Sequence, residues 1–486
     1  MRWVDELTDG KPAEDLAIID HDGETLTYGD LNTAIAQAAE TLKHQGVRAG
    51  DRVLIAAENC AALAITFLAA VRLRAWCIPV HARVTAAELD AIRAHATPRV
   101  SIFTTVVSAD AKAHADRLGA RAVTQSWAAL IDAQTSPEPV FDAPEKQVAT
   151  MVYTSGSTGA PKGVMLSHSN LMFNALVTAR TRHFAPGDTL ILTLPCTHIM
   201  ALATSLLAGL SGGATIRFLA RFTVDAQLRA LAEGGTVMSV VPQIFDQILR
   251  RLDADNAPLN APALRLIGCG GAPLDPALKT QVEARFGLTL QNGYGLTEAA
   301  PGVSSTIYGP PRSDGSIGYV YPGCEVQIDA PGADGAGELL FRGPGVMLGY
   351  YRNPLATAEV MTASGFLRTG DLARIDPDGA LHLVGRKKEL IVRSGFNIYP
   401  PEVEAALMSC PGVLQAAVAG RTLAGNEEVL AFVTTDGSVD KAAIAAHLRQ
   451  RLAPYKQPQH ITILPAMPLT SAGKIRKPAL VEGFAP

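Results

Sequence analysis

The sequence predicts an α/β protein with a large N-terminal domain of parallel sheets, a β-rich subdomain and a small α+β C-terminal domain. Strand-like and helical runs alternate through the first two-thirds of the chain, and helices between buried strands imply parallel sheets covered on both faces. From about Gly318 short strands alternate with glycine turns, and after Gly385 the order becomes β-α-β-α-β. A chain of 486 residues also exceeds one ordinary core, so several domains are expected.

The first helix is predicted by a capping pair, because Thr27 and Asp30 stand three residues apart at its start. Apolar residues follow at helical spacing up to Gly46, where the helix should stop: Leu31, Ile35, Ala38 and Leu42. Further helices are expected from Cys60 and from Gln243. The parallel strands are predicted as short apolar runs at residues 52–56, 77–80, 148–152, 189–194, 215–219, 236–241 and 264–268.

Beyond residue 318 the predicted strands are 325–328, 338–342, 372–375 and 381–384. The last two are joined by Asp376-Pro-Asp-Gly379, whose aspartates could suggest a calcium loop, but the other ligands are missing, so a turn is expected. The C-terminal part should contain strands at 389–392, 415–419, 429–433 and 460–464. Its helices are expected between Pro400 and Pro411 and over residues 441–452.

The composition excludes several classes of function. A net charge of −4 offers no basic surface for nucleic acid or for an anionic membrane. The two longest apolar runs, Cys60–Val71 and Ile199–Leu210, fall short of the roughly 20 residues that a transmembrane helix needs, so buried core helices are expected there. The acidic N-terminus does not resemble a signal peptide. Six scattered cysteines without metal-site spacing predict buried thiols in a reducing, cytoplasmic compartment.

The strand at residues 148–152 runs into the most distinctive segment of the chain, residues 153–163. This segment holds three glycines, four serines or threonines and one lysine, a composition that presents several N–H groups and a compact positive charge to an anion. It differs from the P-loop pattern, because Lys162 follows Pro161 and precedes Gly163. A flexible linker would explain the glycines but not this Pro-Lys-Gly ending. A phosphate-binding loop is therefore predicted.

The segment resembles the signature loop of the adenylate-forming (AMP-binding) superfamily, which comprises acyl- and aryl-CoA synthetases, peptide-synthetase adenylation domains and beetle luciferases. Other segments resemble further motifs of that superfamily in the same order, at residues 26–31, 291–298, 369–371, 385–388 and 469–477. The resemblance covers nearly the whole chain. It implies an N-terminal AMP- and acyl-binding domain over residues 1–385 and a mobile C-terminal domain over residues 386–486, with a hinge at Arg386-Lys387.

The resemblance also implies a set of ATP-binding residues. The β- and γ-phosphates would be held by Lys162 together with Thr154, Ser155, Gly156, Ser157, Thr158 and Gly159. Glu298 would bind Mg²⁺ and Thr297 would contact the phosphate during catalysis, although outside this motif the pair would indicate only a helix start. The adenine would lie against the small residues Gly270, Gly271, Ala272 and Pro273, with Tyr294 covering its other face. Asn292, Gly293 and Gly295 belong to the same nucleotide-binding motif as Tyr294. Asp371 and Arg386 would bind the ribose.

Three further residues are assigned to the reaction by the same resemblance. A carboxylate must first be converted to an acyl-AMP anhydride before a thiol can displace it, and Lys474 would stabilise the charge that develops at the α-phosphate. His198 would be the aromatic gate between the acyl site and the thiol tunnel, although a lone histidine beside an apolar helix is more often a core residue. Gly395 would lie beside the tunnel in the second half-reaction.

The forms of the motifs favour the acyl-/aryl-CoA synthetase branch, because residues 385–404 and 471–477 resemble its versions more than those of peptide-synthetase adenylation domains. ATP, Mg²⁺ and coenzyme A are therefore expected as cofactors. Cys196-Thr197 departs from the bulkier pair usual before the histidine and leaves the pocket shape open. The segments expected to line the pocket, residues 199–209, 241–245 and 299–303, contain no lysine or arginine. This favours an apolar monocarboxylic acid (fatty, alicyclic or aromatic) over a dicarboxylate.

Two other functions stay open: a stand-alone adenylation enzyme that loads a carrier protein, and a non-catalytic nucleotide-binding homologue. Lys474 argues against the second, since binding alone would not need it. A luciferase-like oxygenase is disfavoured because the C-terminus lacks a peroxisomal signal. The expected partners are small molecules, without nucleic acid or a transmembrane segment, and a homodimer stays open.

Overall fold

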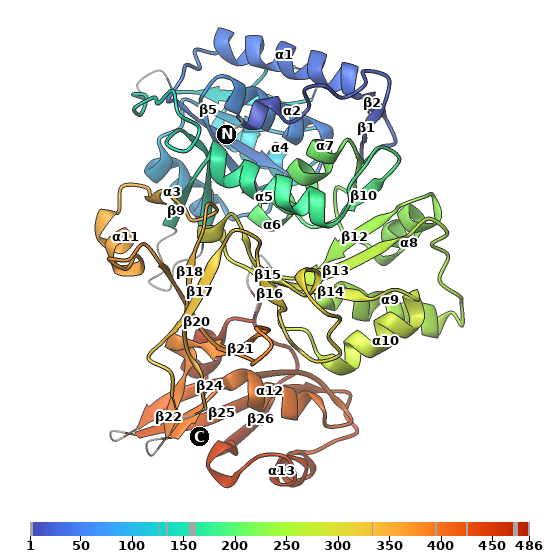
Figure 1. The fold of residues 1–486 in the computed structure, drawn as a ribbon, viewed down its shortest axis with the longest axis vertical. Coiled ribbons are helices and arrows are strands. Elements are labelled where there is room, and N and C mark those ends of the chain that lie inside the picture. The colour runs from blue at the N-terminus through green and yellow to red at the C-terminus, as the bar shows by residue number, and fades with distance from the viewer. Residues whose placement is uncertain are drawn as a thin grey trace. The chain divides into compact units, whose positions relative to one another are not determined.

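The computed structural model describes residues 3–124, 126–132, 135–154, 162–332, 334–393, 396–423, 426–469 and 475–484. They form two compact units, one of residues 1–325 and 341–367 and the other of residues 326–340 and 368–486 (Figure 1). The α/β fold class predicted from the sequence is confirmed. In the described part of the chain, no helix combines the length and the apolar character needed to cross a membrane.

The first unit contains an eight-stranded sheet with a parallel centre. Its order is β19 (Gly349–Tyr350), β9 (Lys162–Ser167), β8 (Val148–Thr154), β4 (Trp76–His81), β3 (Arg52–Ala57), β5 (Val100–Phe103), β7 (Ala128–Ile131) and β6 (Arg121–Ala122). The pairs β8–β4, β4–β3 and β3–β5 are parallel, whereas the strands at both edges are antiparallel. The predicted parallel strands thus form the centre, and hairpins extend it at each side.

A nine-stranded sheet in the same unit has a similar plan. Its order is β16 (Tyr319–Val320), β15 (Gly302–Ser305), β14 (Leu290–Gly295), β13 (Leu266–Gly270), β12 (Val237–Val240), β10 (Thr189–Leu192), β11 (Thr215–Phe218), β1 (Leu16–Ile19) and β2 (Thr25–Thr27). The strands from β14 to β1 are parallel, and β2, β15 and β16 are antiparallel additions. Loops that follow neighbouring parallel strands therefore meet at one edge of this sheet.

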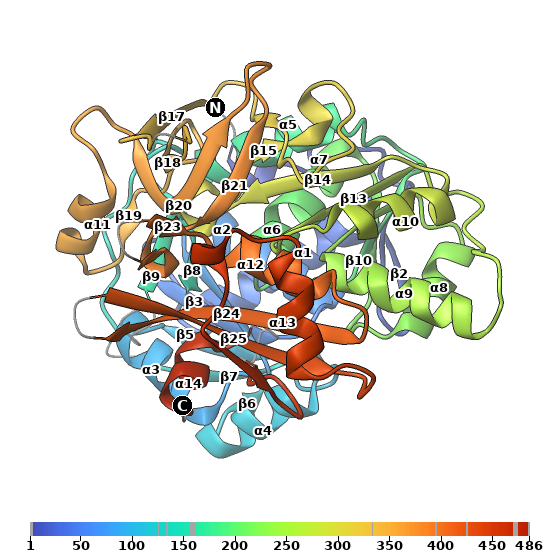
Figure 2. The same ribbon diagram turned by 90° about the horizontal axis from the view of Figure 1, so that it is seen from below.

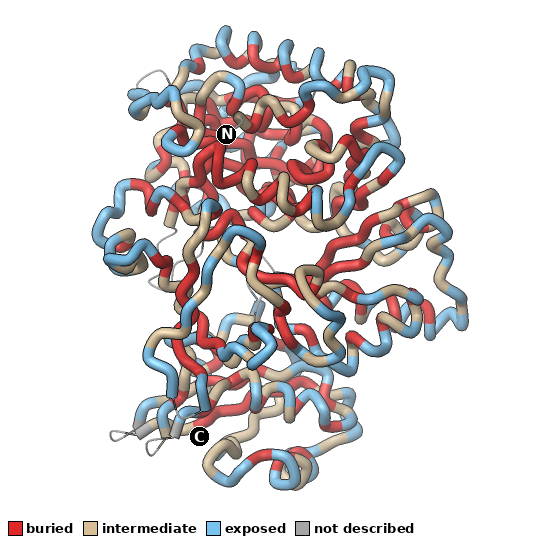
Figure 3. The backbone as a smooth tube through the Cα atoms, in the orientation of Figure 1, coloured by how far each residue is buried: buried red, intermediate tan, exposed pale blue. Residues whose placement is uncertain are grey.

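Helices cover both faces of these sheets, because alternate residues of a strand point to opposite sides. Val53 and Ile55 pack in a central layer with α2 (Ala61–Arg72) and α5 (His168–Thr181), whereas Leu54 and Ala56 pack with α3 (Ala86–Ala96) and α4 (Ala109–Leu118). The outer face of the nine-stranded sheet packs against α8 (Val224–Ala232), α9 (Pro242–Ala254) and α10 (Pro276–Phe286). The backbone of the central layer is mostly buried (Figure 3).

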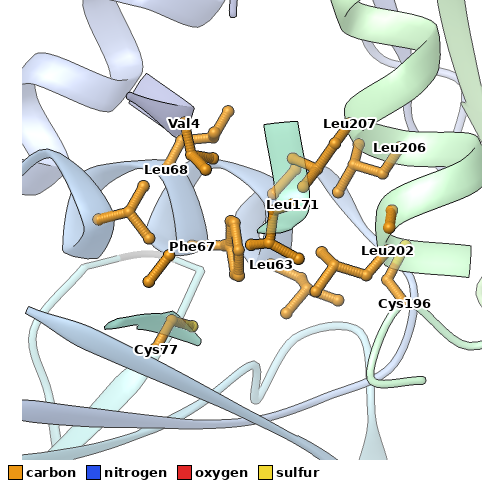
Figure 4. Packing of buried hydrophobic residues seen from close by; sticks show 14 of the residues in the cluster. Val4, Leu63, Phe67, Leu68, Cys77, Leu171, Cys196, Leu202, Leu206 and Leu207 are labelled. Atoms are coloured by element: carbon orange, nitrogen blue, oxygen red, sulfur yellow. The ribbon is translucent and has the colours of Figure 1, made fainter. Parts of the chain in front are cut away.

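Both long apolar runs form core helices, as predicted. The second of them, from Ile199, is divided into α6 (Ile199–Ala201), a π-helical turn (Leu202–Leu207) and α7 (Ala208–Gly212). Leu202, Leu206 and Leu207 pack with residues of α2 and α5 in the central layer (Figure 4). The predicted capping pair Thr27–Asp30 opens α1 (Tyr28–His44), and α11 (Pro354–Val360) and short 3₁₀ turns at Val4–Glu6, Thr297–Ala299 and Thr306–Tyr308 complete this unit.

The second unit contains most of a four-stranded sheet, in the order β17 (Glu325–Asp329), β18 (Gly337–Arg342), β20 (Leu367–Ile375) and β21 (Leu381–Arg386). The turn predicted at Asp376–Gly379 joins β20 and β21. A 3₁₀ turn at Lys387–Glu389 then leads to the short hairpin of β22 (Ile391–Arg393) and β23 (Phe396–Ile398). The domain boundary predicted at residues 385–386 thus lies inside one compact unit, and it stays a prediction.

The remainder of the second unit has the predicted α+β character (Figure 2). It comprises α12 (Pro400–Met408), β24 (Val413–Leu423), β25 (Asn426–Thr435), α13 (Lys441–Arg449), a 3₁₀ turn (Pro454–Lys456), β26 (His460–Ile463) and α14 (Lys477–Glu482). β25 pairs antiparallel with β24 and parallel with β26. One face of this sheet packs with α12 and α13, and Leu430 and Phe432 on the other face pack with Met467 and Leu480.

Candidate active site

The predicted phosphate loop joins β8 and β9, and the structure describes its two ends. Thr154, at the end of β8, pairs with Lys162, at the start of β9, in an antiparallel register. The two ends of the loop are therefore held opposite each other by the hairpin. Ser155, Gly156, Ser157, Thr158 and Gly159 lie outside the described residues, as do Gly395 and Lys474.

Two other site residues meet at the side chain of Tyr350. The Tyr350 hydroxyl donates a hydrogen bond of 2.8 Å to Oε1 of Glu298, and the Lys162 ammonium lies 4.8 Å from the centre of the Tyr350 ring. Burial, with the nearby Glu298 carboxylate, raises the pKa of Tyr350 far above its usual value, so the hydroxyl remains protonated and donates. A predicted metal ligand and a predicted phosphate-binding lysine are thus brought to one aromatic ring.

The main chain of Glu298 is also held by a hydrogen bond. Glu298 lies in the 3₁₀ turn Thr297–Ala299, directly after β14 and Leu296, and its carbonyl oxygen accepts a hydrogen bond of 2.9 Å from the Met347 N–H. The buried Asn170 side chain, at the start of α5, donates to the carbonyl oxygens of Pro344 and Val346 and so holds the loop before β19. Helix α5 and β19 therefore both support the position of Glu298.

The two segments predicted to hold adenine occupy adjacent parallel strands. Gly270 ends β13 and pairs with Gly293 of β14, so the Gly270–Pro273 turn and Tyr294 leave the same edge of the sheet. Gly271 has φ = +75°, a conformation that glycine adopts without strain. At Gly295 a Cβ would come within 2.1 Å of the Pro301 carbonyl oxygen, which only glycine avoids. A larger residue at Gly295 would therefore clash with the neighbouring backbone.

The side chain of Asn292 is engaged within the sheet. It is buried, its Nδ2 donates 2.9 Å to the Ser316 carbonyl oxygen, and its Oδ1 lies 3.5 Å from the Cys269 thiol as an acceptor. In this conformation Asn292 connects β13 to the segment before β16. A contact from its side chain to adenine stays a prediction that would require these bonds to be exchanged.

His198, the predicted gate, is exposed and lies directly before α6. The loop before it is held by two buried amides. Asn59 accepts a hydrogen bond of 2.8 Å from the Cys196 N–H and donates to the Leu194 carbonyl oxygen, and Gln227 accepts one from the Thr193 hydroxyl. Because Asn59 follows β3 and the loop follows β10, this contact joins the two large sheets at the base of the predicted gate.

A second histidine lies close to His198. His81 ends β4, and burial lowers its pKa to about 4, with further lowering by the positive charges of Arg83, His198 and Arg221. The negative charge of Asp110 raises the pKa of His81, but by less. His81 is therefore neutral at pH 7, and it adds an imidazole beside the predicted gate that the sequence pattern did not suggest.

The segments predicted to line the acyl pocket divide into two groups. Most apolar side chains of residues 199–209 are packed in the central layer between the sheets (Figure 4). Met200 instead lies against the adenine turn, since a Cβ built at Gly270 would be 3.4 Å from its Cε. A Cβ at Gly271 would be 3.8 Å from Val241 and 3.9 Å from the Met200 sulfur. Met200 and Val241 are therefore the apolar side chains that the structure places beside this turn.

The predicted ribose site lies in the second unit. Asp371 of β20 is buried and forms an ion pair of 3.0 Å with Arg386 at the end of β21, where the two residues are antiparallel partners. The two ribose-binding predictions are thus brought together, with the carboxylate held by the guanidinium. Arg386 is itself exposed.

Sequence reasoning did not single out Tyr350, Asn59 or His81. Tyr350 belongs to a Gly-Tyr-Tyr-Arg run next to a loop, which gave a weak signal because two neighbouring aromatic residues usually indicate core packing. Asn59 and His81 each follow a predicted strand, at the end where functional loops of parallel sheets gather. That placement was the signal that could have found them.

Comparison with known proteins identifies the family of the chain. The family described as "AMP-binding enzyme" matches residues 5–351, and the family of its C-terminal domain matches residues 402–474. A feruloyl-CoA synthase of Amycolatopsis sp. is 35% identical over 470 residues, which cover 94% of each chain. An ATP-bound MatB of Rhodopseudomonas palustris has a TM-score of 0.87 at 29% identity, over 99% of this chain and 98% of that one.

An O-succinylbenzoate coenzyme A synthetase of Bacillus subtilis, in complex with ATP and a magnesium ion, has a TM-score of 0.82 at 25% identity. The alignment covers 97% of this chain and 98% of that one. The matches extend over both units, and the curated relatives include a 4-coumarate–CoA ligase of Oryza sativa and an indoleacetate–CoA ligase of Aromatoleum aromaticum. The chain belongs to the AMP-binding enzyme family, in its acyl- and aryl-CoA synthetase branch.

Proposed function

We propose that this AMP-forming acid–thiol ligase joins an apolar monocarboxylic acid to coenzyme A through an acyl-AMP intermediate and releases AMP and pyrophosphate. The observation that carries the proposal is the meeting of Glu298 and Lys162 at Tyr350, beside the two ends of the predicted phosphate loop. A carboxylate and an ammonium held together there provide one group for a cation and one for a phosphate.

The described residues fit a magnesium ion that accompanies ATP. The Tyr350 hydroxyl donates a hydrogen bond to Oε1 of Glu298, and among the described residues Oε2 has no hydrogen-bond partner. Mg²⁺ prefers hard oxygen ligands and is usually bound by one or two carboxylates together with substrate phosphates. Glu298 would hold the ion, which when bound neutralises charge on the phosphates.

The remaining roles belong to residues of this chain. We propose that Lys162, Thr154 and Thr297 bind the phosphates, and that the Gly270–Pro273 turn and Tyr294 hold the adenine. Asp371, oriented by Arg386, would accept hydrogen bonds from the ribose hydroxyls. Lys474 would offset the charge that develops as the acid attacks the α-phosphate. His198 and Gly395 would border the path of the thiol in the second half-reaction.

The acid should be apolar, and an aromatic acid is the first candidate. Met200 and Val241 place an aliphatic and a thioether surface beside the adenine turn, and the predicted pocket segments contain no cation that could hold a second carboxylate. The similarity to a feruloyl-CoA synthase supports an aromatic substrate.

A panel of aromatic, alicyclic, fatty and dicarboxylic acids, each assayed with ATP, Mg²⁺ and CoA for AMP release, tests the proposal. We expect AMP and a thioester with apolar monocarboxylic acids and little turnover with dicarboxylates. Formation of ADP while the acid is consumed would contradict the adenylate mechanism. A parallel assay with a phosphopantetheinylated carrier protein in place of CoA separates a ligase from a carrier-loading enzyme.

A cytoplasmic location and a homodimer also stay predictions. Cell fractionation and light scattering, respectively, would test them.

A further inference from the structure

Tyr350 touches two residues of the predicted ATP site without belonging to any motif that defines it. Its hydroxyl is bonded to Glu298, and its ring lies under the Lys162 ammonium. We infer that Tyr350 is a positioning residue for ATP, whose hydroxyl fixes the metal-binding carboxylate and whose ring holds the phosphate-binding lysine. The inference rests on the proposed function of Glu298 and Lys162.

Tyr350 is held in place by burial and by its strand. It is 7% exposed, and β19 pairs with β9 so that Tyr350 lies opposite Val164. Its own N–H donates 2.9 Å to the Thr357 hydroxyl, and the next N–H, of Tyr351, donates 2.8 Å to the Gly163 carbonyl oxygen. The main chain that carries the ring is therefore held against β9, and burial restricts the ring itself.

The hydroxyl of Tyr350 restricts the side chain of Glu298. A free glutamate side chain has several rotamers, and ordering it costs free energy whenever a cation binds. The hydrogen bond from Tyr350 selects one rotamer in advance and satisfies one carboxylate oxygen. The second oxygen is left without a partner among the described residues and can bind a cation at little further cost in entropy.

The ring of Tyr350 contacts the side chain of Lys162. Its ammonium lies 4.8 Å from the ring centre, within the range of a cation–π contact. The hydroxyl of Tyr350 therefore contacts the Glu298 carboxylate, and its ring contacts the Lys162 ammonium. Mutation can remove the hydroxyl alone or together with the ring. Tyr350→Phe removes only the hydroxyl, whereas Tyr350→Leu removes the ring as well.

A neighbouring tyrosine provides the matched control. Tyr351 is the next residue, is 4% exposed and donates its hydroxyl to the Glu138 carboxylate at 2.5 Å. Its side chain packs with Trp76 and His95, away from Glu298 and Lys162. Tyr351→Phe thus removes a buried hydroxyl bonded to a glutamate at the adjoining position, and that glutamate, Glu138, is not among the predicted ATP-binding residues.

The test measures the binding of a non-hydrolysable ATP analogue by calorimetry, with Mg²⁺ and with EDTA. We expect Tyr350→Phe to weaken binding with Mg²⁺ by about tenfold, because a hydrogen bond to a charged group is lost, and to change binding in EDTA less than twofold. Tyr350→Leu should also weaken binding in EDTA, and this extra loss should disappear in a Lys162→Ala background. Tyr351→Phe should leave both affinities unchanged, and thermal unfolding confirms that each variant is folded.

The outcomes separate this inference from the proposal on which it rests. If Glu298→Gln abolishes the effect of Mg²⁺ while Tyr350→Phe leaves it intact, the metal site stands and the positioning role is wrong. If Glu298→Gln has no effect on the Mg²⁺ dependence, the assignment of the metal ligand itself is wrong. Equal losses for Tyr350→Phe and Tyr351→Phe would indicate a general effect of hydroxyl removal and would also overturn the inference.

Discussion

At the scale of single residues, the reaction depends on charges placed where new charge develops. When a carboxylate attacks the α-phosphate of ATP, negative charge accumulates between the two groups, and Lys474 is the residue that we predict to offset it. Lys474 lies outside the described residues, so its role follows from the resemblance of residues 469–477 to the family motif. The neighbouring Lys477 is instead engaged in ion pairs with Glu389 and Glu404 and is no candidate for the same role.

We predict that Lys474→Ala slows adenylate formation by about 10²–10³, the usual cost of removing one preorganised charge-stabilising group. Thioester formation from a supplied acyl-AMP should change little, because the thiol then attacks the acyl carbon and the proposed rotation of the C-terminal domain would carry Lys474 away from the reacting atoms. Assays with the acid and ATP, and separately with synthetic acyl-AMP and CoA, distinguish the two steps. A loss of similar size in both assays would contradict an adenylation-specific role.

His168 leads to a prediction about acid stability. This residue begins α5 and is fully buried, its Nδ1 accepts a hydrogen bond of 3.2 Å from the Val4 N–H, and Trp3 packs against its ring. Burial, with a smaller effect of the Arg74 charge, lowers its pKa from 6.5 to about 3. Below pH 6.5 the unfolded chain therefore binds a proton that the folded chain does not, so stability falls as the pH falls.

The expected loss from His168 between pH 6.5 and pH 5 is about 2 kcal/mol, since each pH unit in this range contributes roughly 1.4 kcal/mol. His168→Asn, which cannot titrate, should be less stable at pH 8 but should lose less on acidification. Thermal unfolding of both proteins from pH 8 to pH 5 measures this difference. Parallel curves would show that His168 is not the group responsible.

At the scale of elements, helices and strands were predicted best where the sequence signals lie within the element itself. Helix α1 begins and ends within two residues of the prediction, because its cap and its apolar stripe are both local. The strand predicted at 264–268 is found at Leu266–Gly270, so Gly270 ends the strand rather than following it. The edge strands β2 and β19, and β1 next to β2, were not predicted, because all three are short. In addition, β1 and β19 pair with strands that lie far away in the chain.

In the candidate site, too, residues in local motifs were predicted, whereas residues that act through contacts with remote segments were not. Glycine-rich loops and charged motifs predicted Lys162, Glu298, Asp371 and Arg386. The structure brings Lys162 and Glu298 to the side chain of Tyr350 and pairs Asp371 with Arg386, and the roles of these residues stay predictions. Tyr350 and Asn59 act through contacts with segments remote in sequence. No local pattern distinguishes such residues from ordinary buried polar or aromatic residues.

Mutation of Asn59 tests whether this residue holds the loop that precedes α6. Its truncation to alanine leaves the buried Cys196 N–H and the Leu194 carbonyl oxygen without a partner, which should destabilise this region by about 2–4 kcal/mol. Amide hydrogen exchange of residues 190–200 should reveal the effect, because a chain of two units need not unfold in one step. Asn32→Ala, at an exposed asparagine whose side chain accepts one bond from Thr8, is the control and should leave this segment unchanged. Unaltered exchange in Asn59→Ala would show that Asn59 does not hold the loop.

At the scale of the whole molecule, the two half-reactions make conflicting demands. Lys474 is needed at the α-phosphate in the first step, whereas the thiol must reach the acyl group in the second. We therefore propose that the C-terminal domain moves about Arg386-Lys387 between the steps. In the described structure Arg386 is extended (φ −107°, ψ 137°), Lys387 begins a 3₁₀ turn, and its ammonium pairs with Glu338 at 2.9 Å.

A proline at position 387 is compatible with this conformation, because an extended residue is preferred before proline and the φ of a 3₁₀ turn is close to that of its ring. Lys387→Pro should therefore restrict the rotation without unfolding the chain. We expect it to spare adenylate formation and to slow thioester formation, measured in separate half-reaction assays. Lys387→Ala loses the same ion pair with Glu338 but leaves φ free, so it should affect neither step strongly. Equal losses in both half-reactions with Lys387→Pro, or similar losses with Lys387→Ala, would place the hinge elsewhere.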